Sequence, residues 1–205
     1  LKPLQEQRKV PTYASPQCVE LLKNPYKISF AQWVVWGNTD ANFDIQPIEG
    51  KIKTPHHEFD LIPVTGHAPD MLCLHEPDKG WLFSADLWVK EYIRYFMRQE
   101  SMAEQISSLK TVLKLEFDAL FCCHNPQRKG GKELVAQKLQ FLEDFYGRAA
   151  KLYQQGLSPK AIFKAMEMKE LKMIRFLSAG DLAAINMIHS VIRDENAGKT
   201  QDFSI

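Results

Sequence analysis

Three side chains of types that commonly bind metals each follow a short apolar run of the sequence. His67 comes after FDLIPVTG, Asp86 after WLFSA, and His124 after FDALFCC. Short apolar runs bounded by turn residues are typical of buried strands. If these strands share one sheet, their ends bring two imidazoles and a carboxylate to one edge, where a hydrolytic metal site can form. The sequence therefore favours a metal-dependent hydrolase.

The segments around these residues resemble the metallo-β-lactamase superfamily over residues 8 to 146. VTGHAPDM (64–71) is similar to the family's Thr-Pro-Gly-His-Ser/Thr-Pro-Gly segment, and WLFSAD (81–86) to its Leu-Phe-Ser/Thr-Gly-Asp segment. FCCHNP (121–126) stands where the family's final His-Gly lies. The resemblance implies that His67 holds the first metal, that His124 holds the second, and that Asp86 bridges both as the catalytic carboxylate.

The resemblance also implies cofactors, a reaction and a fold. The cofactors are two divalent metal ions, zinc first and iron as the alternative, and a metal-bound hydroxide attacks an ester, thioester, lactone or phosphodiester. A mononuclear iron oxygenase of the same family, such as a persulfide dioxygenase, uses the same ligand types and stays open. The fold class is α/β, part of a four-layer αββα sandwich, with the C-terminal portion of that domain over 1–131 and a helical C-terminal extension over 132–205.

The family's signature, His-x-His-x-Asp-His, does not occur in the 205 residues. In the family it supplies two ligands to each metal, so one ligand per metal plus the bridge remains here. A catalytic zinc ion needs about three protein ligands, so we expect this chain alone to bind metal weakly or not at all. Because the chain opens at Leu1 in what resembles the middle of the domain, we expect a fragment whose signature lies upstream. Smaller departures are Thr65, Ala85 and Asn125, where the family has Pro, Gly and often Gly.

A second hypothesis belongs to a different functional class, a non-catalytic binding or scaffold protein. Half of a sandwich leaves open strand edges and an apolar sheet face, which a partner or a second copy of the chain can cover. A homo-oligomer is therefore an open alternative to a monomer that binds a small-molecule substrate.

Residues 89–101, VKEYIRYFMRQES, follow Asp86 and are expected near the mouth of the site. Arg94 and Arg98 are one helical turn apart with Tyr95 beside them, which suits an anionic group of a substrate. The alternative is a solvated segment whose aromatic rings pack on the sheet. Two further aromatic residues, Trp33 and Trp36, form either a lid or core.

Composition excludes several classes of function. The 26 basic and 25 acidic residues give a net charge of +1, which provides no electrostatic basis for binding nucleic acid. No apolar run approaches the roughly 20 residues that span a bilayer, so no membrane is expected. The adjacent pair Cys122 and Cys123 argues against a disulfide framework, and a reducing cytoplasm is the expected location.

Turn residues and apolar periodicity predict the remaining elements. Ser15-Pro16 begins a helix that ends near Lys23, and the capping box Ser101–Glu104 begins another. His75 is expected at the surface of a hairpin strand. Further strands are expected over 51–54, 58–64, 71–77, 81–85 and 117–122, and further helices over 132–155 and from Ser158 and Ser178 onward.

Overall fold

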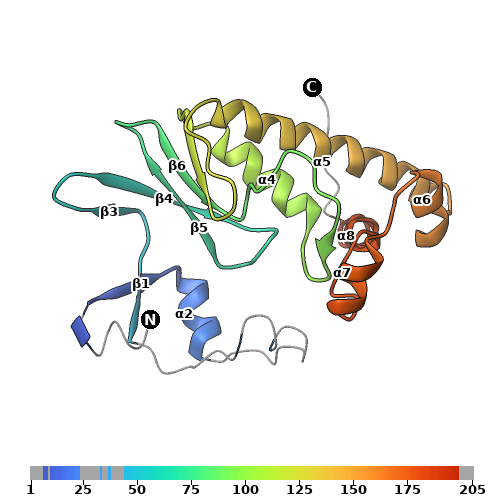
Figure 1. Ribbon diagram of the computed structural model, residues 1–205, viewed down its shortest axis with the longest axis horizontal. Helices are drawn as coiled ribbons and strands as arrows, with labels where there is room; N and C mark the ends of the chain where they lie inside the picture. The colour runs from blue at the N-terminus through green and yellow to red at the C-terminus, as the bar shows by residue number, and fades with distance from the viewer. Residues whose placement is uncertain (1–6, 9, 24–32, 34–36, 38–43, 199–205) are drawn as a thin grey trace.

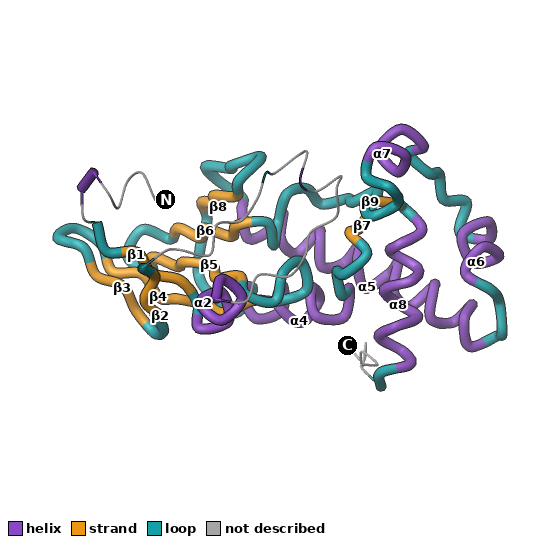
Figure 2. Tube along the Cα trace, turned by 90° about the horizontal axis from the view of Figure 1, so that it is seen from below, coloured by secondary structure: helices purple, strands orange, loops and turns teal. Residues whose placement is uncertain are grey.

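The computed structural model describes residues 7–8, 10–23, 33, 37 and 44–198. A sheet lies at one end of the molecule, and the long helix α5 runs from it to a cluster of short helices at the other end (Figures 1 and 2). Trp36 lies outside the described residues, so its proposed place in a lid or core stays a prediction. The strands are β1 (Thr12–Ala14), β2 (Ile45–Pro47), β3 (Lys51–Lys53), β4 (Glu58–Val64), β5 (Met71–Glu76), β6 (Trp81–Ala85), β7 (Phe96–Met97), β8 (Ala119–Cys122) and β9 (Leu182–Ala183). The helices are α2 (Pro16–Lys23), α4 (Met102–Val112), α5 (Gly131–Gln154), α6 (Pro159–Ala165), α7 (Lys172–Leu177) and α8 (Ile185–Asn196).

The main sheet has the order β3-β4-β5-β6-β8. Its first four strands form an antiparallel meander, and β8 returns parallel to β6 after the chain has passed through α4. Two smaller pairs, β1 with β2 and β7 with β9, lie outside this sheet. The expected meander and its β5–β6 hairpin are confirmed. Pro63 fits within β4 because the pairing with β3 ends at Asp60, with one further hydrogen bond from the Leu61 amide to the Gly50 carbonyl oxygen, so Pro63 lies beyond the stretch where that edge needs a donor.

The two faces of the main sheet differ in burial. Leu82 and Ser84 of β6 are fully buried, whereas Trp81 and Phe83, which alternate with them, are only partly buried. On this second face the Phe83 ring stacks on Phe121 with centroids 4.7 Å apart, and Phe59 meets Phe83 edge-on at 5.9 Å. We call the partly exposed set Phe59, Trp81, Phe83 and Phe121 the aromatic face.

Helices α4 and α5 cover the other face and contribute much of the core. Ser101 caps α4 by accepting a hydrogen bond from the Glu104 amide at 3.3 Å, as the capping box predicts. The helix expected over 132–155 is confirmed as α5, and its residues Leu142, Phe145 and Ala149 are buried. The sheet and its helix layer agree with the expected α/β class, and the division at residue 131 stays a prediction.

Two local predictions were wrong. Ser178 does not start a helix but ends α7, because Ala179 and Gly180 adopt positive φ values of 50° and 79° that stop the helical path. The following helix, α8, begins only at Ile185. His75 is not at the surface but 4% exposed, since β5 turns it toward the Glu116 carbonyl oxygen, 2.9 Å from its Nε2.

Gly66 lets the segment that carries His67 pack closely against the start of α4. Its φ is +103°, and a Cβ placed there would lie 2.3 Å from the Gln105 amide nitrogen. The Gly66 carbonyl accepts a hydrogen bond from the Ser101 amide at 2.9 Å. A side chain at position 66 would therefore force α4 away from the sheet.

We expect Gly66→Ala to lower the free energy of unfolding by about 2 kcal/mol or more, from overpacking and backbone strain together. Gly147→Ala, in α5, is the matched control because nothing lies within 4 Å of its added Cβ. It should raise stability by about 0.8–1 kcal/mol, since Ala favours the helix. Urea unfolding measures both variants, and equal effects would contradict the proposed close contact.

Candidate metal centre

The structure brings His67, Asp86 and His124 together at one rim of the main sheet. They follow β4, β6 and β8, three strands of that sheet. His67 Nε2 lies 3.7 Å from Asp86 Oδ2, and His124 Nε2 lies 3.3 Å from Asp86 Oδ1. One carboxylate therefore stands between two imidazoles, and each imidazole faces a different oxygen.

A bulge in β6 aims the carboxylate of Asp86. The pairing with β8 shifts register between Phe83 and Ala85, and Ala85 has a φ of 46°. Such a bulge redirects the next side chain. Glycine adopts this φ without strain, which explains why the resemblance places Gly where this chain has Ala85. Asp86 Oδ1 is buried without a hydrogen-bond partner among the described residues, a costly state for a carboxylate oxygen that a nearby cation would relieve.

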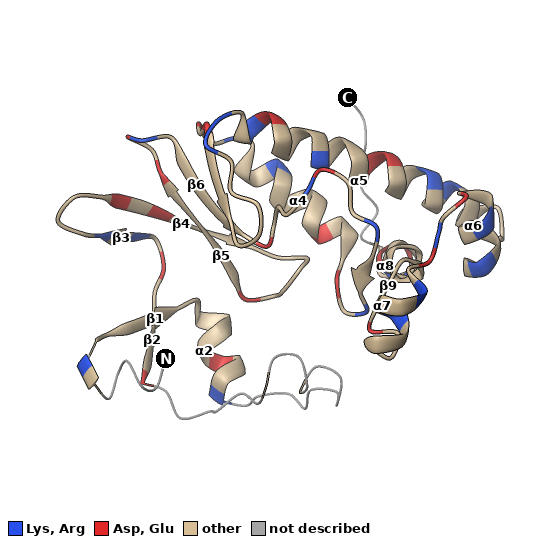
Figure 3. Ribbon diagram, viewed as in Figure 1, with Lys and Arg blue, Asp and Glu red and all other residues tan. Residues whose placement is uncertain are grey.

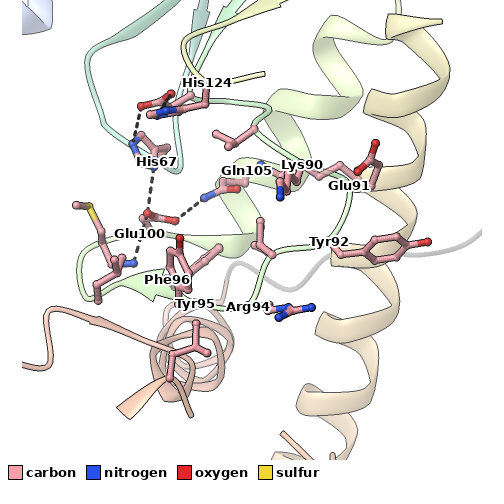
Figure 4. A pocket seen from close by; sticks show the side chains of 17 residues that line it. His67, Lys90, Glu91, Tyr92, Arg94, Tyr95, Phe96, Glu100, Gln105 and His124 are labelled. Atoms are coloured by element: carbon pink, nitrogen blue, oxygen red, sulfur yellow. Dashed lines mark hydrogen bonds and ion pairs between the residues drawn. The ribbon is translucent and has the colours of Figure 1, made fainter. Parts of the chain in front are cut away.

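Glu100 fixes the orientation of His67. Its Oε1 lies 3.0 Å from His67 Nδ1, on the opposite side of the ring from Asp86; Figure 4 shows His67 between Glu100 and His124. An ionised carboxylate only accepts hydrogen bonds, so His67 Nδ1 carries the hydrogen, and Nε2 is the ring nitrogen that faces Asp86. This hydrogen bond raises the pKa of His67, against the opposing effect of burial. Metal-binding histidines commonly have such a carboxylate behind them.

Glu100 is itself held by several neighbours. It is 6% exposed, and its Oε2 accepts a hydrogen bond from Gln105 Nε2 at 2.8 Å. Its Oε1 also accepts from the Met97 amide at 3.4 Å. The carboxylate therefore has little freedom to leave His67.

A buried lysine lies beneath the site. Lys138 of α5 is 3% exposed, and its Nζ donates a hydrogen bond to the Leu87 carbonyl oxygen at 2.6 Å. Burial lowers its pKa to about 8, although the negative charges of Glu100 and Asp86 act in the opposite direction. Lys138 thus braces the main chain directly after Asp86.

The donor types fit a pair of metal ions, but the number of donors falls short. Each metal would receive one imidazole nitrogen and one oxygen of Asp86, where zinc in catalytic sites has about three protein ligands. Within the described ranges, no group of three or more His, Cys, Asp or Glu side chains is placed to hold a metal ion. The ligand roles of His67, Asp86 and His124 stay predictions.

A pocket of about 740 Å³ opens beside these residues. Arg94 and Tyr95 line it, whereas Arg98 is not among its lining residues. Figure 4 shows Arg94 and Tyr92 across the pocket from the two histidines. The helical spacing expected for Arg94 and Arg98 is wrong, because the short strand β7 lies between them. Arg98 lies instead near Gly180, with Nη2 3.5 Å from the position of a Cβ built on it.

Glu100 and Lys138 were not predicted from the sequence. Lys138 left a signal, since it interrupts the apolar stripe of α5 between Val135 and Leu142. Glu100 precedes the capping box of α4, and nothing in the local pattern distinguishes it from a solvated residue.

Comparisons with known proteins bear on the fold. No family model and no curated protein matches the sequence. Among solved structures, a double mutant of the sec-alkyl sulfatase PisA1 superposes with a TM-score of 0.64 at 15% identity, covering 97% of this chain and 38% of the other. A metallo-β-lactamase from Pontibacter korlensis gives a TM-score of 0.54 at 14% identity, covering 70% of this chain and 62% of the other. The chain has the metallo-β-lactamase fold.

A third structure, TTHA1623 in a di-iron-bound form, gives a TM-score of 0.51 at 22% identity and covers 67% of each chain. This chain spans less than two thirds of the length of both the PisA1 structure and the Pontibacter korlensis metallo-β-lactamase. The similarity establishes the fold, and any activity of these proteins reaches this chain only as a proposal.

We expect Lys138→Met to change how stability depends on pH. Between about pH 8 and its ordinary pKa of 10.5, the folded chain has released the Lys138 proton while the unfolded chain still binds it. The free energy of unfolding of the wild type should therefore rise with pH relative to Lys138→Met over this window, by of order 3 kcal/mol. Denaturant unfolding at several pH values measures the difference.

Lys151→Met is the control, because Lys151 lies on the same helix and is exposed. The difference in the free energy of unfolding between Lys151→Met and the wild type should not change with pH over the same window. A flat difference for Lys138→Met as well would contradict a buried lysine with a lowered pKa.

Proposed function

We propose that this chain forms part of a metal-dependent hydrolase of the metallo-β-lactamase superfamily. The observation that carries the proposal is the single carboxylate of Asp86, which faces His67 and His124 through different oxygens and whose buried Oδ1 has no hydrogen bond among the described residues. A carboxylate in this position suits a bridge between two cations, because it neutralises part of their mutual repulsion while binding each. Asp86 is then the residue on which the site depends.

The proposed cofactors are two divalent ions, zinc first and iron as the alternative. The di-iron-bound form of TTHA1623 shows that a protein of similar fold holds iron, which supports keeping that alternative. When bound, such ions lower the pKa of water and supply a hydroxide nucleophile. The remaining ligands needed to reach three per metal must come from residues other than these three.

The residues of this chain orient the site before any metal arrives. Glu100 keeps the hydrogen of His67 on Nδ1, so that Nε2 is the ring nitrogen available to bind a metal. The bulge at Ala85 and the bond from Lys138 to Leu87 fix the main chain on both sides of Asp86. His124 is more exposed than His67 and supplies the second imidazole.

The proposed substrate is a small molecule with an ester, thioester, lactone or phosphodiester bond. The pocket of about 740 Å³ is within the roughly 300–1,000 Å³ range of small-molecule sites. Arg94 and Tyr95 line it and are proposed to contact the substrate, with Arg94 suited to an anionic group. Arg98 does not line the pocket, and its guanidinium lies toward Gly180.

The wider setting is also proposed. Basic and acidic residues are interspersed along α5 (Figure 3), which supports a small-molecule substrate over nucleic acid. None of the described helices is long and apolar enough to cross a membrane. All four cysteines are free thiols, and on that basis we propose the cytoplasm as the location.

Replacing Asp86 tests the proposed metal site. Asp86→Asn keeps the shape of the side chain but removes its charge, so zinc affinity should fall by at least the roughly 10- to 100-fold typical of losing an outer-shell partner. Turnover of a panel of thioester, lactone and phosphodiester substrates should fall with it. Isothermal titration with zinc and the substrate panel provide the measurements.

Asp78→Asn is the matched control, since Asp78 is exposed in the β5–β6 turn. Asp78→Asn should behave as the wild type. Equal zinc affinity in Asp86→Asn and the wild type would rule out the proposed site.

The aromatic face favours a second candidate function, a binding protein that associates through this surface. Its four rings are only partly buried, whereas Leu82 and Ser84 on the other face of the sheet are fully buried. Apolar surface of this kind is typically covered by a partner or a second copy. A homo-oligomer is the simplest form of this proposal.

If a second copy covers the aromatic face, Phe121→Glu should convert an oligomer into a monomer, because burying a charge in an apolar interface is costly. Light scattering coupled to size-exclusion chromatography measures the mass. Phe176→Glu is the control, since Phe176 is 84% exposed on α7 and outside the aromatic face. A wild type that is monomeric at all concentrations would exclude self-association.

A further inference from the structure

One side of α8 binds the chain segment that leads into α4. Asn186, Ser190, Arg193 and Asp194 recur at helical spacing, so they lie on one side of α8. Asn186 Nδ2 donates to the Phe96 carbonyl oxygen at 3.0 Å. The other three contact residues 100–103, about ninety positions earlier in the sequence. Figure 1 shows α8 beside the lower end of α4.

The first turn of α4 receives its hydrogen-bond acceptors from α8. The Met102 amide donates to Ser190 Oγ at 2.8 Å, and the Ala103 amide donates to Asp194 Oδ2 at 3.0 Å. Asp194 Oδ1 accepts from the hydroxyl of the capping residue Ser101 at 2.9 Å. The first amides of a helix lack partners within the helix, and a carboxylate beside them also interacts favourably with the helix dipole. The start of α4 is thus fixed by a distant helix.

The same helix fixes Glu100, the residue directly before this cap. Arg193 Nη2 donates to the Glu100 carbonyl oxygen at 2.6 Å. The side chain of Glu100 extends the other way, to His67 Nδ1. The contacts therefore run without interruption from α8 through the main chain of Glu100 to the ring of His67.

We propose that Arg193 and Asp194 are positioning residues for His67, acting through Glu100 and the first turn of α4. Together they hold Glu100 in the position where its carboxylate keeps the hydrogen of His67 on Nδ1. Nε2 is then the nitrogen available as a metal ligand. That Nε2 then binds a metal rests on the proposed function, whereas the position of the hydrogen on the His67 ring does not. The C-terminal helix is then part of the site and not an appendage.

Glu195 offers a matched comparison on the same helix. Its carboxylate accepts hydrogen bonds from Tyr146 Oη and Gln154 Nε2, both at 2.9 Å, and both partners lie on α5. Glu195→Gln therefore weakens the packing of α8 without touching residues 100–103. Arg193 offers a second pair, because Arg193→Lys keeps a donor toward Glu100 and Arg193→Met does not.

The experiment uses the full chain without added metal, at a pH above the His67 titration recorded for each variant, so that neutral rings are compared. Nitrogen-15 NMR of the histidine rings gives the fraction of the Nδ1–H form of His67, with Glu100→Ala defining complete loss of the acceptor. Hydrogen exchange reports the Ala103 amide. We expect Asp194→Asn and Arg193→Met to lower the fraction of the Nδ1–H form of His67, by at least half of the drop that Glu100→Ala produces. In Asp194→Asn the Ala103 amide should also exchange roughly fivefold faster or more.

Arg193→Lys should restore most of the wild-type ring signal, and Glu195→Gln should leave it unchanged. An unchanged His67 ring in both Asp194→Asn and Arg193→Met would overturn the proposal, as would an equal shift in Glu195→Gln. If Asp194→Asn does not fold, the Arg193 pair decides alone. A parallel zinc titration separates the two proposals, because the ring signature can follow these variants even if the wild type binds no zinc.

Discussion

The site depends on one electrostatic constraint, a partly buried carboxylate held between two imidazoles. Asp86 Oδ1 has no hydrogen-bond partner among the described residues, and an unpaired buried carboxylate oxygen costs on the order of 1–3 kcal/mol or more. The nearest buried cation, Lys138, directs its ammonium to the Leu87 carbonyl oxygen instead. The fold thus keeps this negative charge beside the two histidines, with His124 Nε2 at 3.3 Å and His67 Nε2 at 3.7 Å. This stored cost is expected where a cation will later bind, because the same burial that penalises the free carboxylate strengthens its attraction to a positive charge.

Holding that carboxylate in place requires backbone conformations that ordinary strands do not supply. Ala85 takes a positive φ at the bulge, and Gly66 takes one where the chain passes against α4. Each departs from the regular path directly before a site residue, so strand direction alone does not set the side-chain directions at the rim. Backbone strain of this kind persists only where the surrounding packing over-determines it. Here that packing comes from α4 and α5, which makes the helix layer as necessary to the site as the strands that carry it.

Much of this arrangement could be predicted from the sequence, because its causes are local. The runs before His67, Asp86 and His124 end in turn residues, and each forms a strand close to its expected bounds. The error at His75 also has a local cause, since alternation along a strand says which residues share a face and not which face is covered. On β6 the fully buried side chains are Leu82 and Ser84, whereas the larger Trp81 and Phe83 lie on the partly exposed face. The turn at Ala179 was missed because alanine rarely adopts a positive φ.

Glu100 was beyond the reach of sequence reasoning for a different reason. What makes it part of the site is contact with His67 at a separation of 33 residues and with Arg193 at 93, and no periodicity encodes such distances. The same holds for Ser190 and Asp194, which look like ordinary polar positions on a helix until α4 is placed beside them. Polar residues that are buried together must satisfy one another, since each would otherwise pay the cost of leaving water. A polar residue at a position that helical spacing assigns to the buried side therefore implies a partner elsewhere in the chain, although only the fold shows which partner. Lys138 follows this rule on α5, where it donates to the Leu87 carbonyl oxygen directly after Asp86. Asp194 follows it on α8, where it accepts from the Ser101 hydroxyl and the Ala103 amide.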